Sequence, residues 1–400
     1  MSDGLPHPVA SAEDTPGIRR AWGWLAHLSD GGTTPWRDWA GEAASRGRYV
    51  PGAQQLETLR RLNLRGAVPA ALARRVLEAS APGRGRPDLE LAGAVDRQPF
   101  GPPPVDPADL PDDELVRVAV SVLADLVVEA GGMAAWPGPG AAVPGVPHPH
   151  RLVGPAAVLG AVRRRLPQPR SRRYRLVGDP LLADPLREQL VARGRPPGGS
   201  GSRVLVLGDD AGSLVVDAWT HRTLTDGAPP WRDWLRSRAR GRTLPGRVDV
   251  LRAARAWQDR VGRDRVHVVL DPALVPRLVG VPAVPPVTGR VSADAAELAR
   301  RVGPVLGLLA VPERKQALVR TVLLPWLGDH DGPPLAVPPE HADWLQGTAE
   351  RVRDALLRDG YAVHGDPDRL LPVERPGVSQ PSDAGALELA LRLLLEKTTP

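Results

Sequence analysis

The sequence predicts an α/β fold: a parallel sheet of strand–loop–helix units, a helical C-terminal cover and a largely helical N-terminal region. Short runs of branched apolar residues alternate with helical segments from about residue 150 onward. After residue 290 the hydrophobic periodicity is that of helices. The chain has 400 residues, of which 42% are hydrophobic, so it is long enough for two or three domains with a large core.

Four short apolar runs are the predicted strands. Each is followed by a turn that contains Gly or Asp, and then by a segment with helical periodicity. Helices of about 10–15 residues between strands are typical of βαβ units, in which the strands are parallel. We therefore expect one parallel sheet with strands at residues 151–153, 174–177, 203–207 and 266–270.

Helices are predicted both before and after the strands in the sequence. Residues 115–128 follow Asp112 and Asp113 and are apolar on nearly every helical face, which indicates a buried helix with an acidic start. The C-terminal cover is predicted from four helical segments, at residues 293–308, 313–327, 339–359 and 385–397.

Three stretches rich in Pro and Gly, at residues 81–113, 131–149 and 372–382, have the composition of loops or linkers. The sequence accordingly predicts three parts. These are an N-terminal helical region over 1–110 with a Pro-Trp-Arg-Asp-Trp motif, an α/β domain over 111–372, and a linker with a C-terminal helix over 373–400.

The composition excludes several classes of protein. The chain has no Cys, which excludes thiol catalysis, cysteine-bound zinc and disulfides. It has no run of about 18 uncharged apolar residues, so a membrane-spanning helix and a membrane partner are not expected. The N-terminal residues lack the basic and apolar regions of a secretion signal, so a cytoplasmic location is expected.

The basic residues are almost all Arg. Lys315 and Lys397 are the lysines among 52 basic residues, and 46 acidic residues leave a formal net charge of +6. Arg suits phosphate recognition, but an Arg bias also follows from GC-rich codon usage. The densest clusters lie at 163–165 and 170–173 and the other arginines are dispersed, so nucleic-acid binding is not expected unless folding gathers arginines on one face.

The Pro-Trp-Arg-Asp-Trp motif occurs twice, at 35–39 and 230–234, each time after a Leu-Ser/Thr-Asp-Gly string. Pro at a helix start, with two Trp three residues apart, places both indoles on one helical face. That face is either an aromatic platform for a ligand or the buried side of a helix, and burial is favoured because large aromatics usually serve cores. The indoles concerned are those of Trp36, Trp39, Trp231 and Trp234.

Acidic residues follow three of the predicted strands. In an open parallel sheet, ligands bind outside the carboxyl ends of the strands. One interpretation is therefore an acidic mouth for a cation or an amine. The other, which is favoured, is that these residues cap the following helices by accepting hydrogen bonds from free N–H groups. The residues concerned are Asp179, Asp209, Asp210 and Asp271.

Other candidate sites are sparse. No phosphate-binding loop with Lys follows a strand, and His148 with His150 lacks a carboxylate at ligand spacing, so neither a cofactor nor a metal is expected. His267 lies within an apolar strand and is expected to be a core residue. His221 lies on a helix and is a candidate acid or base without an identified partner.

Residues 200–372 resemble actinobacterial proteins of the P-loop sulfotransferase-like superfamily. The resemblance rests on Ala218-Trp219 in a helix, on a helix at 251–257 followed by Arg-Val-Gly and a strand, and on the Gly-Tyr-Ala-Val-His-Gly-Asp string at 360–366. It implies an α/β fold and transfer of a sulfo group from 3′-phosphoadenylyl sulfate.

The chain departs from this family at the donor site. The family's Lys-Ser-Gly-Thr-like loop has no counterpart, since residues 152–155 are Leu-Val-Gly-Pro. Alignment on Trp219 places Asp209 and Asp217 where the family has an Arg and a Ser for the donor's 3′-phosphate. Two carboxylates repel a phosphate dianion, and the exchange of Arg for Asp removes a charge-assisted hydrogen bond.

The resemblance and these departures together predict a degenerate sulfotransferase-like protein that lacks donor-dependent transfer and binds a partner or ligand. One alternative is an active transferase with an altered donor site, so whether the chain is an enzyme is not decided by the sequence. The other alternative is an Arg-rich nucleic-acid binder.

Overall fold

The computed structural model describes residues 23–28, 30–40, 53–62, 68–79, 112–133, 173–199, 201–281 and 291–398. They belong to two compact units. Unit 1 comprises residues 1–133, 297–327 and 381–400, and unit 2 comprises residues 134–296 and 328–380. Each unit therefore contains segments from distant parts of the sequence.

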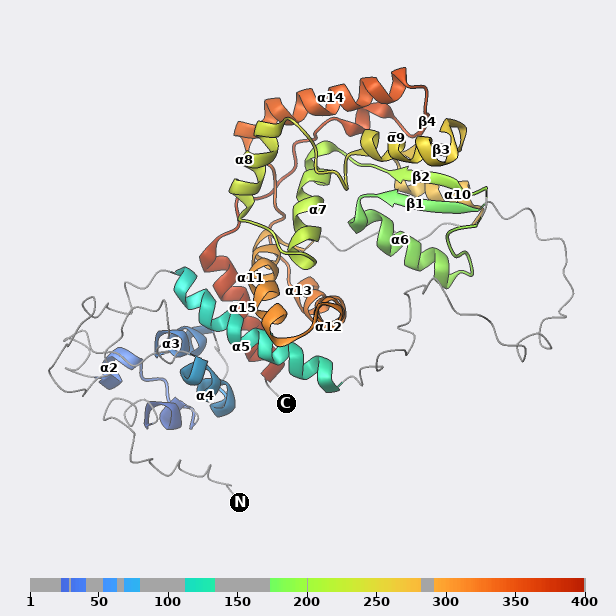
Figure 1. Cartoon of the computed structure of the whole chain (residues 1–400). Helices are drawn as coiled ribbons and strands as arrows, with labels where there is room; N and C mark the ends of the chain where they lie inside the picture. Colours follow the sequence, from blue (N-terminus) through green and yellow to red (C-terminus); the bar gives the residue numbers. More distant parts are fainter. Residues whose placement is uncertain are drawn as a thin grey trace, which may run out of the picture. The chain divides into compact units, whose positions relative to one another are not determined.

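Unit 2 contains a four-stranded, fully parallel sheet in the order β1-β2-β3-β4 (Figure 1). Three strands confirm the sequence prediction: β1 (Tyr174–Gly178), β2 (Arg203–Leu207) and β3 (Val266–Val269). The expected strand at 151–153 and the Arg clusters at 163–173 lie outside the described residues, except for Arg173 at the start of β1.

Both faces of the sheet are buried. One face, with Val204 and Val206 of β2, packs against α7 (Ala211–Leu224), α9 (Val250–Val261) and α14 (Ala342–Arg358). The other face, with Leu205 and Leu207, packs against α6 (Pro180–Ala192) and α10 (Val275–Val279). Because alternate residues of a strand point to opposite faces, the uninterrupted apolar run of β2 is what a strand covered by helices on both sides requires.

The fourth strand, β4 (Ala362–His364), corrects the expectation of helices alone after residue 290. It pairs with β3 in the register Val268↔Val363. The strand has only three residues, which is too few for the alternation of apolar and polar residues that identifies a strand in a sequence. It is a strand because its backbone groups pair with those of β3. The remaining elements of unit 2 are α8 (Trp231–Gly241), η4 (Arg263–Arg265), η5 (Pro272–Leu274), η7 (Pro339–His341) and η8 (Pro367–Leu370).

Unit 1 is helical where it is described. The long apolar α5 (Asp112–Met133) packs against α15 (Asp383–Thr398), although the two helices are far apart in the sequence. Unit 1 therefore combines residues from the N-terminal part of the chain with the C-terminal helix, and the division at 110 and 372 that composition indicated stays a prediction. The other elements are α2 (Trp36–Ala40), α3 (Ala53–Leu62), α4 (Ala70–Ala79), α12 (Pro312–Leu318) and the π-helical η6 (Val319–Leu323). Most of α11 (Ala293–Leu309) and of α13 (Leu324–Gly328) also belongs to unit 1, while residues 293–296 and 328 belong to unit 2.

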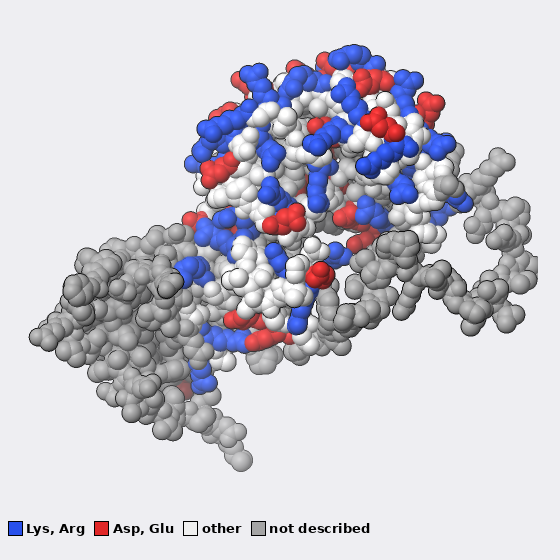
Figure 2. All heavy atoms as spheres, viewed as in Figure 1, with Lys and Arg blue, Asp and Glu red and all other residues white. Residues whose placement is uncertain are grey.

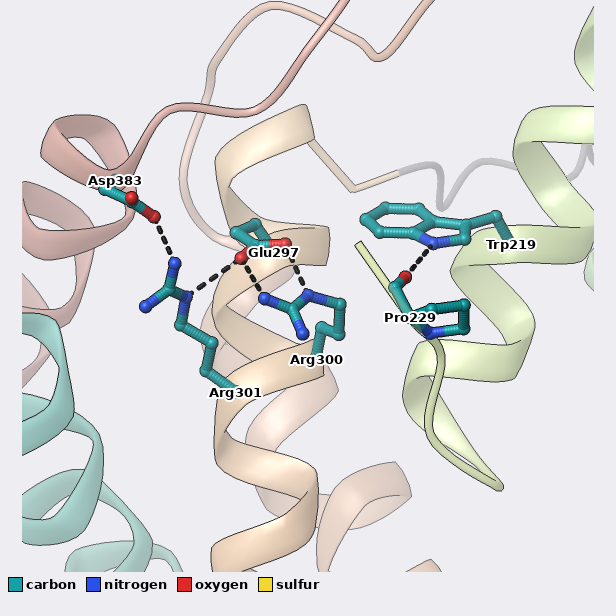
Figure 3. Close-up of polar contacts among 6 residues, drawn as sticks. All are labelled: Trp219, Pro229, Glu297, Arg300, Arg301 and Asp383. Atoms are coloured by element: carbon teal, nitrogen blue, oxygen red, sulfur yellow. Dashed lines mark hydrogen bonds and ion pairs between the residues drawn. The ribbon is translucent and has the colours of Figure 1, made fainter. Parts of the chain in front are cut away.

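A largely buried carboxylate connects α11 to the start of α15 in unit 1 (Figure 3). The side chain of Glu297 accepts hydrogen bonds from Arg300 Nε at 2.7 Å and Arg301 Nε at 2.9 Å, and Arg301 also pairs with Asp383. The hydrogen bond to Glu297 raises the pKa of Arg300. One carboxylate thus balances two guanidinium groups that are themselves mostly buried.

We expect Glu297→Gln to destabilise unit 1 by about 2–4 kcal/mol, because it leaves the mostly buried guanidinium group of Arg300 without its counter-charge and that of Arg301 with Asp383 alone. The matched control is Glu388→Gln on α15, which removes a pair with Arg392 that is about half exposed on both sides. That change should cost less than about 1 kcal/mol. Urea unfolding followed by circular dichroism measures both losses, and equal losses would show that the Glu297 network does not stabilise the fold.

Candidate functional site

The acidic residues at the carboxyl ends of the strands cap the elements that follow. Asp179 accepts a hydrogen bond from Leu181 N at 3.0 Å, Asp210 from Ser213 N at 3.0 Å, and Asp271 from Ala273 N at 3.1 Å. The capping interpretation is confirmed for these three side chains. Asp209 accepts from the backbone N–H of Asp210 at 2.9 Å.

A cavity of about 1000 Å³ lies within unit 2, beside the first turns of the helices that follow β1 and β2. Its wall comes from the N-terminal half of α7, from residues 334–346 and from residues 372–379, with Leu181 of α6 and Val291 completing it. The cavity is large enough for a small organic ligand and lies at the end of the sheet where open α/β proteins bind theirs.

The wall of this cavity is apolar with an excess of negative charge. Four carboxylates line it, and one guanidinium group opposes them. Asp217 on α7 is 1% exposed, whereas Asp343 and Glu374 are exposed at the rim. The hydroxyl groups of Ser213 and Thr220 add further polar groups along the same helix. The carboxylates are those of Asp210, Asp217, Asp343 and Glu374, and the guanidinium group is that of Arg375.

Residues 372–379 are held to the cavity wall at two points. Val378 forms a parallel bridge with Leu335, in which Ala336 N donates to Val378 O and Val378 N donates to Pro334 O, both at 2.9 Å. Arg375 Nη2 pairs with Asp210 Oδ2 at 2.7 Å. The cap of α7 and this ion pair therefore share one carboxylate, which is 2% exposed.

The structure places only part of the predicted acidic mouth at this cavity. Asp210 and Asp217 line it, whereas Asp179, Asp209, His221 and Asp271 are not among its described lining residues. Asp179 and Asp271 are engaged as caps. His221 is on α7, and burial together with the charge of Arg247 lowers the pKa of its imidazole. The charges of Asp184 and Asp226 act in the opposite direction, but burial and Arg247 outweigh them, so the pKa of His221 is still lowered.

Three charged residues of the wall are not indicated by the sequence: Asp343, Glu374 and Arg375. Residues 372–382 have a linker composition, and nothing in their pattern indicates that Arg375 pairs with an Asp 165 positions earlier. Asp343 is in the first turn of α14, where an acidic residue is common for helix electrostatics alone. Only the folded chain brings these residues together.

Both copies of the Pro-Trp-Arg-Asp-Trp motif form the same local structure. In unit 2, Trp219 Nε1 donates to Pro229 O at 3.0 Å (Figure 3). The ring of Trp219 packs against that of Trp231 at 5.3 Å and 62°. In unit 1, Trp24 Nε1 donates to Thr34 O at 3.0 Å, and its ring packs against that of Trp36 at 5.1 Å and 59°. The repeat therefore extends to a third Trp that begins each copy.

These indoles are core residues. Trp36, Trp231 and Trp234 are buried, and Trp39 is half-buried and stacked on His27. The burial confirms the helix-anchor interpretation for the three buried side chains and contradicts an exposed aromatic platform. Trp231 has an indole neighbour on each side, since its ring also stacks on Trp234 at 5.7 Å.

We expect Trp231→Ala to destabilise unit 2 by about 3–5 kcal/mol, because it opens a large cavity between two indoles. Trp231→Phe is the control, since it retains an aromatic ring between Trp219 and Trp234 and should lose clearly less. Urea melts of both variants check the prediction. Equal stability of the Ala variant and the wild type would contradict a core role.

His267 is half-buried and forms a pair with a second histidine that the sequence did not indicate. Its Nδ1 lies 2.9 Å from Nε2 of His364 on the neighbouring strand β4. Burial lowers the pKa of His267, and the charges of His364 and Arg203 lower it further. Burial and Arg203 also lower the pKa of His364. The pair is thus stable when it carries no net charge.

The unfolded chain binds more protons than the native state below the ordinary histidine pKa of 6.5, because both folded values are lower. The free energy of unfolding should therefore be largest above that pH and fall as the pH decreases below it. His364→Gln removes one titrating group and one repulsive charge, so the free energy of unfolding should depend less steeply on pH below 6.5. Urea melts at a series of pH values above and below 6.5 measure this dependence. An unchanged dependence in the variant would contradict a contribution from the histidine pair.

No protein-family model matches the chain, and the searches of curated proteins and of solved structures also give no match. Among the described residues, no group of three or more His, Asp or Glu is placed to hold a metal ion. None of the described helices is long and apolar enough to span a membrane. The sulfotransferase resemblance therefore stays a prediction.

Proposed function

We propose that unit 2 is a sulfotransferase-like module that has lost donor-dependent transfer and binds a small ligand in the cavity at the carboxyl ends of β1 and β2. The single observation that supports this most is the charge of the wall, where four carboxylates face one guanidinium group. A donor with two phosphate groups would meet repulsion there instead of a cationic cradle.

The same wall favours a ligand with a cationic head and an apolar body. Asp217 is buried, so a cation close to it interacts in a low-dielectric environment, where attraction is stronger than in water. Val216, Leu335 and Leu345 supply apolar surface in the same cavity. Arg375 already neutralises Asp210, and the exposed carboxylates of Asp343 and Glu374 at the rim are placed to attract the cation.

Two titrations test the proposal. Isothermal titration with 3′-phosphoadenosine 5′-phosphate should show no binding at millimolar concentration, and micromolar binding would overturn the loss of the donor site. Benzylamine should bind more tightly than benzyl alcohol, which has a similar shape but no charge. Equal binding of the two probes would show that the carboxylates do not select the ligand.

Glu374→Gln at the rim should weaken benzylamine binding by about tenfold while leaving the fold intact, because the side chain is exposed. Asp217→Asn tests the buried carboxylate with the same readout. The matched control is Asp259→Asn on α9, which removes one exposed negative charge away from the cavity. A loss of the same size in this control would attribute the effect to overall charge and contradict a specific site.

A further inference from the structure

One strongly basic face of unit 2 is not part of the cavity. Residues 230–248 contain six Arg and a single acidic residue, Asp233, although acidic and basic residues are nearly balanced in the whole chain. Trp231, Trp234 and Leu235 point into the core. The exposed side of α8 and of the turn after it carries Arg232, Arg236, Arg240, Arg242 and Arg247. Figure 2 shows Lys and Arg atoms gathered over the position of α8.

The exposed arginines form a continuous row. Arg232, Arg236 and Arg240 are four residues apart, so they share one face of α8 at steps of about 6 Å along its axis. Arg242 continues the row in a left-handed conformation with φ of 47°. Arg351 of α14 joins it, since its Nη2 donates to the backbone oxygen of Arg242 at 3.3 Å.

The structure uses few of these charges internally. Arg236 pairs with Asp233 at 3.0 Å, but both side chains are more than half exposed, so the pair contributes little. Within the described part of the chain, no ion pair involves Arg232, Arg240, Arg242 or Arg247. The row is therefore available to an external anion.

Helix electrostatics explain only half of the row. Cations stabilise the C-terminal end of a helix, which accounts for Arg240 and Arg242. Arg232 is in the first turn of α8, where a positive charge is unfavourable. Codon usage raises the Arg content of the whole chain, but it does not explain why these arginines share the exposed side of a helix whose other side is buried in the core.

We propose that this arginine row binds the phosphate backbone of nucleic acid without reading its sequence. Guanidinium forks bind phosphate oxygens in pairs, and a row of them matches a polymer with regularly repeated phosphates. An anionic membrane is a poorer fit, because membrane-surface helices insert an apolar face and that of α8 is buried in the core. Folding thus places on one exposed face arginines that are already close together in residues 230–248.

The expected binding is weak and sensitive to salt. Each phosphate contact on duplex DNA contributes about 0.9 to the slope of log affinity against log salt concentration. A row of three to five arginines predicts a slope of about 3–4, so binding that is measurable at about 50 mM salt should largely disappear at about 200 mM. Loss of binding at this salt concentration is consistent with the small net charge of +6, which attracts DNA little at physiological salt.

The test uses fluorescence anisotropy of a labelled short DNA duplex of random sequence with the full-length chain. The Arg232→Gln/Arg236→Gln/Arg240→Gln variant should bind at least about tenfold more weakly at low salt, with a slope reduced by about 2–3. The matched control is Arg193→Gln/Arg277→Gln/Arg358→Gln, which removes three exposed charges from α10, α14 and the residue after α6. It should change the affinity by less than about twofold.

Equal loss in both triple variants would overturn the proposal, because it would reflect overall charge alone. Absence of wild-type binding at low salt would overturn it as well. Binding to phosphatidylserine vesicles, or competition by polyglutamate as effective as that by DNA, would assign the row to another partner. Thermal melts of both variants confirm that the fold is kept. The outcome is independent of the benzylamine titrations, since no arginine of the row lines the cavity.

Discussion

The buried carboxylate of Asp210 uses both of its oxygens, and the candidate site depends on that. One oxygen accepts the Ser213 N–H at the start of α7, and the other pairs with Arg375. The first contact fixes the beginning of the helix that covers β2, and the second holds residues 372–379 over the cavity. A buried charge is costly without its partner, so the start of α7 and residues 372–379 stabilise each other through the carboxylate of Asp210.

Burial of both sheet faces explains why the polar chemistry lies at one end of unit 2. The four strands offer mostly apolar side chains to the helices on either side, and none of them carries an Asp or a Glu. Their polar side chains are those of Arg175, Arg203, His267 and His364, so the carboxylates lie at the ends of strands and beyond them. At the carboxyl end these groups are carboxylates that cap the following helices. Of these caps only Asp210 lines the cavity, and Asp217, Asp343 and Glu374 from other elements make the wall acidic, which supports the proposal of a cationic ligand.

The amphipathic α8 shows the same separation of roles on the surface. Its Trp and Leu residues complete the core around Trp219, and its arginines face outward. The core side makes the helix rigid, so the arginines are presented at regular intervals and lose little further freedom when an anion binds. Core packing and the proposed phosphate binding are thus assigned to opposite sides of one short helix.

The sequence by itself determined the α/β class, three of the four parallel strands and the caps of the helices, because these depend on local periodicity and on neighbouring backbone groups. It also indicated the burial of Trp36, Trp231 and Trp234. Only the tertiary structure decided that β4 is a strand, that α5 packs on α15, and that Arg375 meets Asp210 across 165 positions. These contacts join residues far apart in the chain, so their free energy arises from packing and charge pairing that no local pattern encodes.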